Sequence, residues 1–234
     1  HHPRFHPSLR QGHHPRAVLM TATADSVDLG IAVNLQEVSH TFKSRAVFEP
    51  VSLQLQAGSE CLIRGTNGSG KSTLGRILSG ELTPATGSVT WSCGAQQLEA
   101  EALCTRSQRV SPATALHPQL TIEELIAFQG QFLPWSSPSA AQDLIQRAGL
   151  ESHMHKAYRD LSSGMQQRVK LALALASQAG LIVLDEPCAN LDASGVAWYR
   201  ETVQAVRGKT TLIVCSNDRS ADFINPDYTL DLNT

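Results

Sequence analysis

The fold is decided by a glycine-rich stretch that reads Gly65-Thr66-Asn67-Gly68-Ser69-Gly70-Lys71-Ser72, followed by Thr73. It matches the pattern GxxxxGK[ST] in full. Glycines let the backbone wrap tightly and point its N–H groups at an anion, with no Cβ atom in the way. In this pattern the lysine reaches the β- and γ-phosphates and the following hydroxyl ligates Mg²⁺. We therefore expect residues 65–73 to bind a nucleoside triphosphate, with Lys71 on the phosphates and Ser72 on the metal.

The residues on either side supply the strand and the helix that such a loop requires. Cys61-Leu62-Ile63 predicts a short buried strand, and apolar residues at 74, 77 and 78 predict a helix that starts at the loop. The first turn of a helix offers unpaired N–H groups and a favourable dipole to a phosphate. The motif and its context together predict nucleotide binding.

A second group of functional residues follows an apolar run far along the chain. Residues 181–187 read Leu-Ile-Val-Leu-Asp-Glu-Pro, so a predicted buried strand ends in two carboxylates. In open parallel sheets, ligands bind at the carboxyl ends of the strands. We expect Asp185 to hold Mg²⁺ opposite Ser72, directly or through water. Glu186 is expected to orient or deprotonate the attacking water.

The order of the expected elements indicates an α/β fold. Strands are expected over 33–38, 46–55, 61–63, 88–91, 181–184 and 211–215, and helices over 74–78, 121–132, 139–148, 163–178 and 193–206. Strands and helices that alternate imply a mainly parallel sheet with helices on both faces. The region from about 95 to 165 is expected to form a mostly helical subdomain.

Composition and charge exclude several classes of protein. The 234 residues suffice for one domain that carries a subdomain. Nineteen Lys and Arg against 21 Asp and Glu give a formal charge of −2, which argues against a dedicated nucleic-acid binder. The apolar runs are far shorter than the roughly 20 residues of a membrane-spanning helix. The five cysteines form no CxxC pair, so we expect free thiols in a reducing cytosol.

The N-terminal residues differ from the rest of the sequence. Residues 1–25 hold five of the nine histidines and show little apolar periodicity. We expect a flexible extension there, with Met20 as a candidate for the native start, and a folded domain over 26–234. A His-rich tract that binds metal is the alternative.

A third motif lies between the glycine-rich loop and the acidic strand end, and it reads Leu-Ser-Ser-Gly-Met-Gln-Gln-Arg over residues 161–168. Its first five residues are similar to LSGGQ, the signature of the nucleotide-binding subunits of ABC transporters, with Ser163 and Met165 departing from it. With all three motifs in order, residues 31–232 resemble such a subunit. The resemblance implies a P-loop ATPase of ABC type that binds ATP and Mg²⁺. It also implies a mainly parallel core sheet, an antiparallel β subdomain and a helical subdomain.

The resemblance further implies partners. In this family two subunits pair head to tail as a homodimer or heterodimer, and each signature closes over the ATP of the other subunit. The residues implied in that contact are Ser162, Ser163, Gly164 and Met165. The N–H groups around Gly164 lie in the first turn of a predicted helix. The start of this helix is therefore a second place that can bind an anion. The helical region is implied to dock on membrane-spanning subunits, which places the protein at the cytoplasmic face of a membrane; no nucleic acid is expected.

Further residues can be compared with the family pattern one by one. Phe42 is similar to the aromatic residue that stacks on adenine, and a core phenylalanine is the alternative. Residues 189–192 are similar to the loop that crosses the dimer interface. Pro112 stands where the family has a glutamine, and proline has neither a side-chain amide nor a backbone N–H. Asn217 stands where a histidine is expected; its amide can bond a γ-phosphate oxygen but carries no charge. Glu186 and Asn217 are the expected catalytic residues. Because Pro112 and Asn217 differ from the family pattern, we expect ATP to bind but to be hydrolysed more slowly than in the family.

Three functions remain open at this point. The first is a hydrolysing subunit that powers a membrane transporter. The second is a regulatory module that binds ATP, hydrolyses it weakly and pairs with an active partner, as Pro112, Met165 and Asn217 suggest. The third is an ABC-type ATPase that acts on ribosomes or DNA; the single cassette and the absence of a heptad run or basic patch weigh against it.

Overall fold

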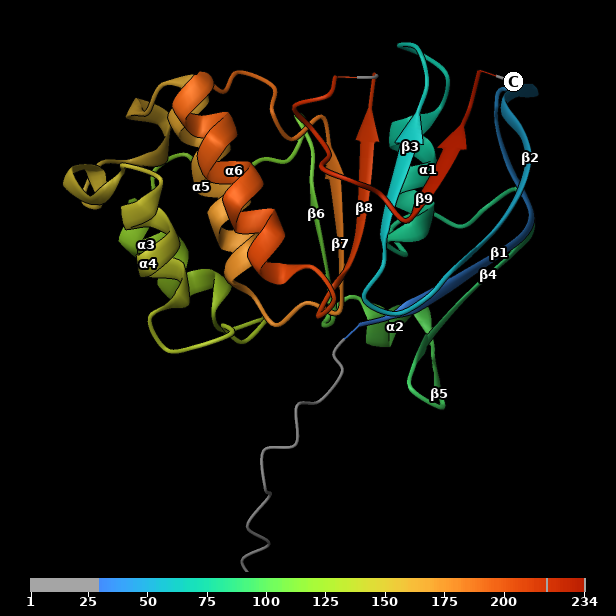
Figure 1. The fold of residues 1–234 in the computed structure, drawn as a ribbon, viewed down its shortest axis with the longest axis horizontal. Coiled ribbons are helices and arrows are strands. Elements are labelled where there is room, and N and C mark those ends of the chain that lie inside the picture. Colours follow the sequence, from blue (N-terminus) through green and yellow to red (C-terminus); the bar gives the residue numbers. More distant parts are fainter. Residues whose placement is uncertain (1–29, 218, 234) are drawn as a thin grey trace, which may run out of the picture.

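The computed structural model of the protein describes residues 30–217 and 219–233. Two sheets and a group of helices make up the fold (Figure 1). The expected His-rich extension over residues 1–25 lies outside the described residues. Within them, none of the helices has both the length and the apolar character needed to cross a bilayer.

The core sheet is parallel and has the order β6-β7-β8-β3-β9. Its strands are β3 (Glu60–Arg64), β6 (Ser107–Val110), β7 (Leu181–Asp185), β8 (Thr211–Ser216) and β9 (Tyr228–Asp231). All four neighbouring pairs are parallel, so the carboxyl ends of the five strands meet at one edge, the upper edge in Figure 1. This arrangement confirms the predicted parallel core.

Strand β7 shows why this sheet needs cover on both faces. Leu181 and Val183 pack with the first core cluster, which includes β3 and the helix after the glycine-rich loop. Ile182 and Leu184 pack with the second cluster, formed by the later helices. Successive side chains of a strand point to opposite faces, so an uninterrupted apolar run is buried from both sides.

The other sheet is antiparallel and has the order β2-β1-β4-β5. Its strands are β1 (Ala32–Phe42), β2 (Arg45–Leu55), β4 (Thr86–Cys93) and β5 (Gln96–Leu98). Lys43 and Ser44 join β1 to β2 with φ angles of 48° and 65°, as a two-residue hairpin turn requires. Val33 and Leu35 on β1 pack into the first core cluster. This is the antiparallel β subdomain that the family resemblance implies.

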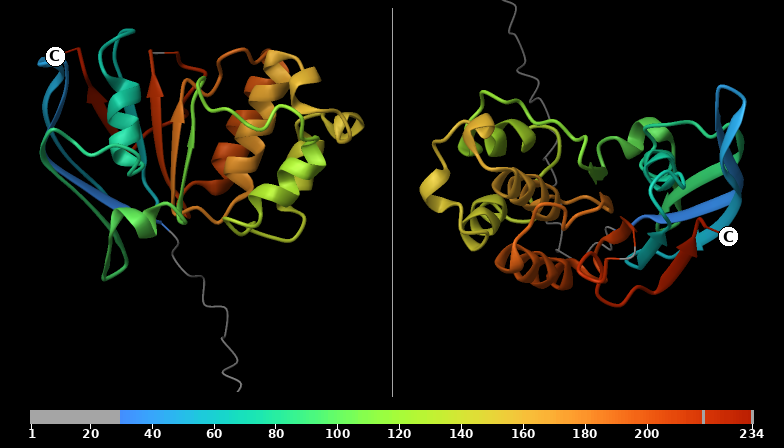
Figure 2. Two further views of the ribbon diagram at one scale, coloured as in Figure 1. Left: turned by 180° about the vertical axis from the view of Figure 1, so that it is seen from behind. Right: turned by 90° about the horizontal axis from the view of Figure 1, so that it is seen from above.

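Helices cover the two faces of the core sheet. Helix α1 (Lys71–Leu78) lies between the two sheets, where Leu74, Ile77 and Leu78 are fully buried. Helices α5 (Ser163–Ala176) and α6 (Ala193–Val206) lie on the opposite face. Seen from above in Figure 2, the later helices gather at one end of the molecule and the antiparallel sheet at the other.

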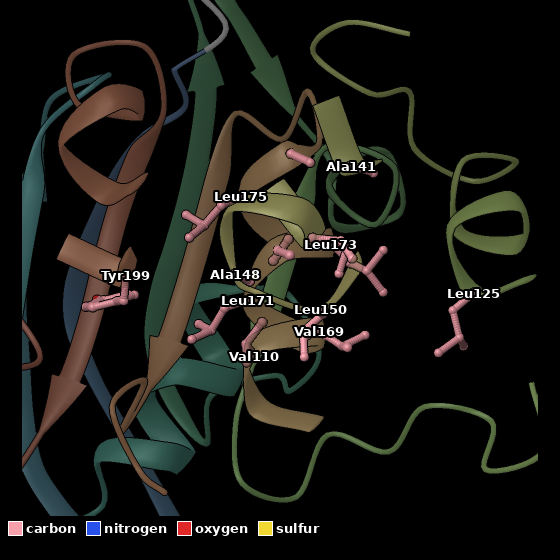
Figure 3. Packing of buried hydrophobic residues seen from close by; sticks show 14 of the residues in the cluster. Val110, Leu125, Ala141, Ala148, Leu150, Val169, Leu171, Leu173, Leu175 and Tyr199 are labelled. Atoms are coloured by element: carbon pink, nitrogen blue, oxygen red, sulfur yellow. The ribbon is translucent and has the colours of Figure 1, made fainter. Parts of the chain in front are cut away.

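Helix α5 packs at the centre of the helical part. Figure 3 shows its Val169, Leu171, Leu173 and Leu175 among side chains of neighbouring elements. The smaller helices are α2 (Ala100–Leu103), α3 (Ile122–Gln129) and α4 (Ala140–Arg147). Helix α3 begins with a capping box between Thr121 and Glu124, which fixes its start.

The expected start of the helical region near residue 95 is too early. Strands β5 and β6 and the short helix α2 occupy residues 96–110, and the larger helices of this region begin with α3. Strand β9 was not predicted at all. Strands β5, β6 and β9 have only three or four residues each, which is too few for a recognisable alternation of apolar and polar side chains.

Candidate active site

The glycine-rich loop wraps around the ammonium group of Lys71. Its Nζ atom donates hydrogen bonds to the carbonyl oxygens of Gly65 at 2.7 Å and Thr66 at 3.0 Å, and the side chain is only 5% exposed. Gly70 has a φ of 97°, and a Cβ atom there would lie 2.7 Å from Phe48 Cδ1. Glycine is therefore required at this position for both its conformation and its size.

The N-terminus of α1 is arranged to receive an anion. Its N-cap, Gly70, provides no side-chain hydrogen bond, and the first turn holds no acidic residue. The N–H groups of the first turn lack partners within the helix itself. Lys71 is the first residue of this helix and adds a positive charge, so this helix end fits a phosphate group.

The glycine-rich loop and the acidic end of β7 line the same cavity, which has a volume of about 740 Å³. From the glycine-rich loop and α1 it is lined by Asn67, Gly68, Gly70, Lys71, Ser72 and Thr73. Asp185 and Glu186 line it from the end of β7, and Phe42 lines it from the end of β1. The volume lies within the range of about 300–1,000 Å³ that is typical of small-ligand sites.

The oxygen ligands on this cavity suit magnesium. The Asp185 carboxylate is almost fully buried, and the Ser72 hydroxyl lies on the same cavity. Mg²⁺ prefers one or two carboxylates together with substrate phosphates. No group of three or more His, Cys, Asp and Glu that could hold a metal occurs within residues 30–217 and 219–233. One carboxylate and one hydroxyl fit a Mg²⁺ ion whose remaining ligands are phosphate oxygens and water.

Glu186 has an unusual backbone conformation. Its φ is 47°, in the left-handed region, and its N–H donates to the Cys215 carbonyl at 2.9 Å. Non-glycine residues in this region are strained and occur often at functional sites. The turn directs the chain away from the sheet directly after Asp185, which leaves Glu186 half-buried on the cavity.

The cavity has a rim of charged residues that the sequence did not reveal. Arg109 at β6 donates from Nε to Glu81 Oε1 at 2.8 Å, and both residues line the cavity together with Arg76. These residues belong to no motif. Arg109 reaches the cavity because β6 pairs with β7, which ends in Asp185.

Some expected binding residues lie beside the cavity. Gly65 and Thr66 line a neighbouring hollow of about 350 Å³ together with Asn217, which is exposed at the end of β8. Ser69 packs against Gly65, where an added Cβ would lie 2.4 Å from the Ser69 hydroxyl oxygen. Phe42 is 53% exposed on the cavity wall, so the core alternative for this residue is wrong. The roles of these residues in binding stay predictions.

Residues 162–165 lie together at the start of α5. Ser162 caps the helix by accepting a hydrogen bond from Met165 N at 3.3 Å. The four residues line a hollow of about 510 Å³ that shares no lining residue with the 740 Å³ cavity. The signature and the phosphate loop of one chain are therefore not brought together.

Arg168 also lines this 510 Å³ hollow, here called the signature hollow, and bonds to residues around it. Its guanidinium donates to the Ala148 carbonyl at 2.7 Å and to Ser194 Oγ at 2.8 Å, and it forms an ion pair with Asp192. Asp192 also caps α6 by accepting from Gly195 N at 2.8 Å. The hydrogen bonds that Asp192 accepts, first from Gly195 N and then from Ser194 Oγ, lower the pKa of its carboxyl group. Through its hydrogen bond to Ser194 and its ion pair with Asp192, Arg168 of α5 is connected to the start of α6.

Replacing Gly164 with Ala should disturb the 189–192 loop. A Cβ atom at Gly164 would lie 2.7 Å from the Asn190 carbonyl oxygen, whereas at Gly75, also inside a helix, it would lie 3.4 Å from Val183. We expect Gly164→Ala to lower ATP hydrolysis by about ten-fold or more, because small misplacements are costly in active sites. Gly75→Ala should keep activity and raise stability by about 0.5–1 kcal/mol. Hydrolysis rates and thermal unfolding of both variants test this; equal behaviour would contradict it.

Pro112 lines the cavity, as expected for the position of the family glutamine. The residue before it is held by a buried lysine: Lys170 of α5 donates from Nζ to the Ser111 carbonyl at 3.2 Å. Burial lowers the pKa of this ammonium group. The loop after β6 is thus tied to the signature helix through its backbone, although Pro112 has no polar side chain.

With a phosphate-binding loop and an acidic strand end on one cavity, the protein has the fold of a P-loop nucleotide-binding protein. Residues 48–189 match the family model described as "ABC transporter". The structure of a bacterial Atm1-family ABC exporter with ATP bound is similar, with a TM-score of 0.73 and 23% identity over 86% of this chain and 37% of that chain. The structure of an ATP-binding subunit of an ABC transporter has a TM-score of 0.70 and 21% identity, and the match covers 80% of this chain and 79% of that one.

The curated relatives agree with this class. The chain is 33% identical over 190 residues to the Nod factor export ATP-binding protein I of Rhizobium johnstonii, a match that covers 78% of this chain and 60% of the relative. It is 34% identical over 185 residues to the Fe(3+) ions import ATP-binding protein FbpC 2 of Pectobacterium atrosepticum, covering 74% and 51%. The chain thus spans between about half and three fifths of these relatives' length. It belongs to the ABC transporter family, as one of its ATP-binding subunits.

Proposed function

We propose that this protein binds Mg·ATP in the 740 Å³ cavity and hydrolyses it to drive a membrane transporter. The observation that carries the proposal is the shared cavity itself, on which Lys71, Ser72, Asp185 and Glu186 all lie. Lys71 and Ser72 begin α1, whereas Asp185 ends β7 and Glu186 follows it, so the cavity joins two parts of the chain that are distant in the sequence. The names of the relatives, which denote ATP-binding proteins of export and import systems, support the coupling to transport.

Each residue has a separate task in this proposal. Lys71 and the first N–H groups of α1 hold the phosphates, since a helix N-terminus and an ammonium group both favour negative charge. Glu186 orients the attacking water and accepts its proton. Ser72 and Asp185 hold the metal. When bound, Mg²⁺ neutralises charge on the β- and γ-phosphate oxygens.

A complete site requires a second subunit. The signature hollow at Ser162–Met165 and the phosphate cavity are separate in one chain. Because the signature helix also presents an N-terminus without acidic residues, it is suited to a second phosphate contact. Two copies, or this chain and a related one, arranged head to tail would place each signature over the other's nucleotide. The pair would work at the cytoplasmic face of a membrane, on membrane-spanning partner subunits.

The regulatory alternative differs only in turnover. Pro112 on the cavity and Asn217 outside it favour a slow ATPase, since neither supplies the side chain that the family pattern has there. Glu186, which lies on the cavity, favours hydrolysis. We therefore propose an ATPase with reduced turnover.

The proposal is tested by metal removal. We expect the purified protein to release phosphate from ATP in the presence of Mg²⁺ and to lose this activity when EDTA is added. Binding should weaken in EDTA as well, because the metal links Ser72 and Asp185 to the phosphates. Phosphate release and binding of a fluorescent ATP analogue, each with and without EDTA, measure both effects. Activity that survives chelation would contradict the proposed site.

A further inference from the structure

Two loops with expected catalytic residues leave neighbouring strands of the core sheet. Glu186 follows β7 and Asn217 follows β8, and these strands pair directly (Figure 1). The Glu186 N–H donates to the Cys215 carbonyl at 2.9 Å, so the two loops are in contact at their origin. Glu186 has a left-handed backbone, with φ of 47°. A strained turn of this kind persists only where surrounding contacts hold it.

A buried carboxylate joins these loops a little further along. Asp222 is fully buried. Its Oδ1 accepts from Cys188 N at 3.0 Å, and its Oδ2 accepts from Ser216 Oγ at 2.6 Å. Cys188 comes two residues after Glu186, and Ser216 comes directly before Asn217. The carboxylate therefore contacts both loops close to the expected catalytic residues.

Asp222 itself is held from a third side by α6. The hydroxyl of Tyr199 donates to the Asp222 carbonyl at 2.7 Å. Arg200 donates to the carbonyls of Ser220 at 2.9 Å and Phe223 at 3.2 Å, on either side of Asp222. Helix α6 is a rigid support, and supports of this kind keep catalytic groups in place.

We propose that Asp222 is a positioning residue that sets the orientation of Glu186 and Asn217 relative to each other. The proposal rests on the function proposed above. Asp222 does not line the 740 Å³ cavity, so it acts through the Cys188 backbone and the Ser216 side chain. Hydrogen bonds that involve an ionised group are stronger than neutral ones, and a buried charge that lacks partners is costly. Loss of the carboxylate would therefore release both loops while leaving the phosphate loop unchanged.

The test compares three variants with a matched control. Asp222→Ala removes both contacts, Ser216→Ala removes one, and Asp222→Asn keeps the shape but changes the acceptors. Thr202→Ala is the control, because Thr202 is buried in the same helix α6 but its hydroxyl donates to the Trp198 carbonyl at 2.8 Å and not to the Asp222 segment. For each protein, kcat and KM for ATP hydrolysis and the thermal unfolding midpoint are measured. Asp222→Asn and Ser216→Ala keep the test decisive if Asp222→Ala does not fold.

We expect kcat to fall by about ten-fold or more in the Asp222 variants, and less in Ser216→Ala, with KM within about two-fold of the original value. Thr202→Ala should lower the unfolding midpoint and leave kcat unchanged. The inference is overturned if the Asp222 variants keep the kcat of the unaltered protein, if Thr202→Ala loses as much kcat as they do, or if their KM rises while kcat stays the same. An unaltered protein that does not hydrolyse ATP would overturn the proposed function as well.

Discussion

Replacing Lys71 with Ala should weaken the binding of Mg·ATP by about 100-fold and reduce hydrolysis below about 1% of the original rate. The ammonium group is buried in the loop and bonded to two loop carbonyls, and Lys71 lines the cavity in which we propose that the triphosphate binds. Charged hydrogen bonds contribute about 1.5–3 kcal/mol each, which corresponds to roughly a ten- to hundred-fold change in affinity. Titration with a fluorescent ATP analogue measures the loss.

A lysine outside the site provides the control for Lys71→Ala. Lys156 is exposed and does not line the cavity, so Lys156→Ala changes the net charge equally and should leave binding as it is. The loop keeps a further support in Lys71→Ala, because Thr66 N donates to Asn233 Oδ1 at 2.8 Å. We therefore expect a similar thermal unfolding midpoint in both variants. ATP affinity that is the same in both would show that Lys71 does not hold the phosphates.

Replacing Glu186 with Gln should lower hydrolysis by about 100-fold or more while ATP binding remains. Glutamine has nearly the same shape but cannot accept a proton from water. The strained turn should survive, since Glu186 makes its contact with Cys215 through the backbone N–H. Phosphate release in single-turnover conditions measures the chemical step. A rate close to the original would exclude Glu186 as the base.

The same variant should accumulate as an ATP-dependent dimer. Hydrolysis would normally reopen the head-to-tail pair, so blocking it keeps two nucleotides between the subunits. Light scattering should show the mass double on addition of Mg·ATP and return to that of the monomer in EDTA. Adding Ser162→Ala to Glu186→Gln should weaken the dimer, because Ser162 is expected to contact the partner's ATP. A Glu186→Gln protein that binds ATP and stays monomeric would contradict the proposed pairing of two copies.

Long and strongly patterned elements were predicted well. The expected helix over 193–206 has the bounds of α6, and the apolar run 181–184 is β7 with one residue added. In both, local patterns and capping residues agree with the final packing; Asp192, for example, caps α6 through its side chain. The phosphate loop was equally visible, because its backbone geometry requires glycine at particular positions.

Elements that depend on distant partners were missed or misplaced. Strand β9 exists because residues 228–231 pair with β3, more than 160 positions earlier. The pair of Arg109 and Glu81 at the cavity and the bond of Asp222 to Cys188 likewise join residues far apart in the chain. Single charged or polar residues of this kind carry no local signal.

The sequence by itself determined the family and the parallel core, and it predicted which residues bind the nucleotide, because glycine loops, buried strands and helix caps are local requirements of the backbone. Tertiary structure alone decided which of those residues share the cavity. It placed Asp185 and Glu186 beside Lys71, left Asn217 outside and put Asp222 beneath both loops. The physical reason is that strand order, unlike strand formation, is set by long-range packing of side chains on both faces of the sheet.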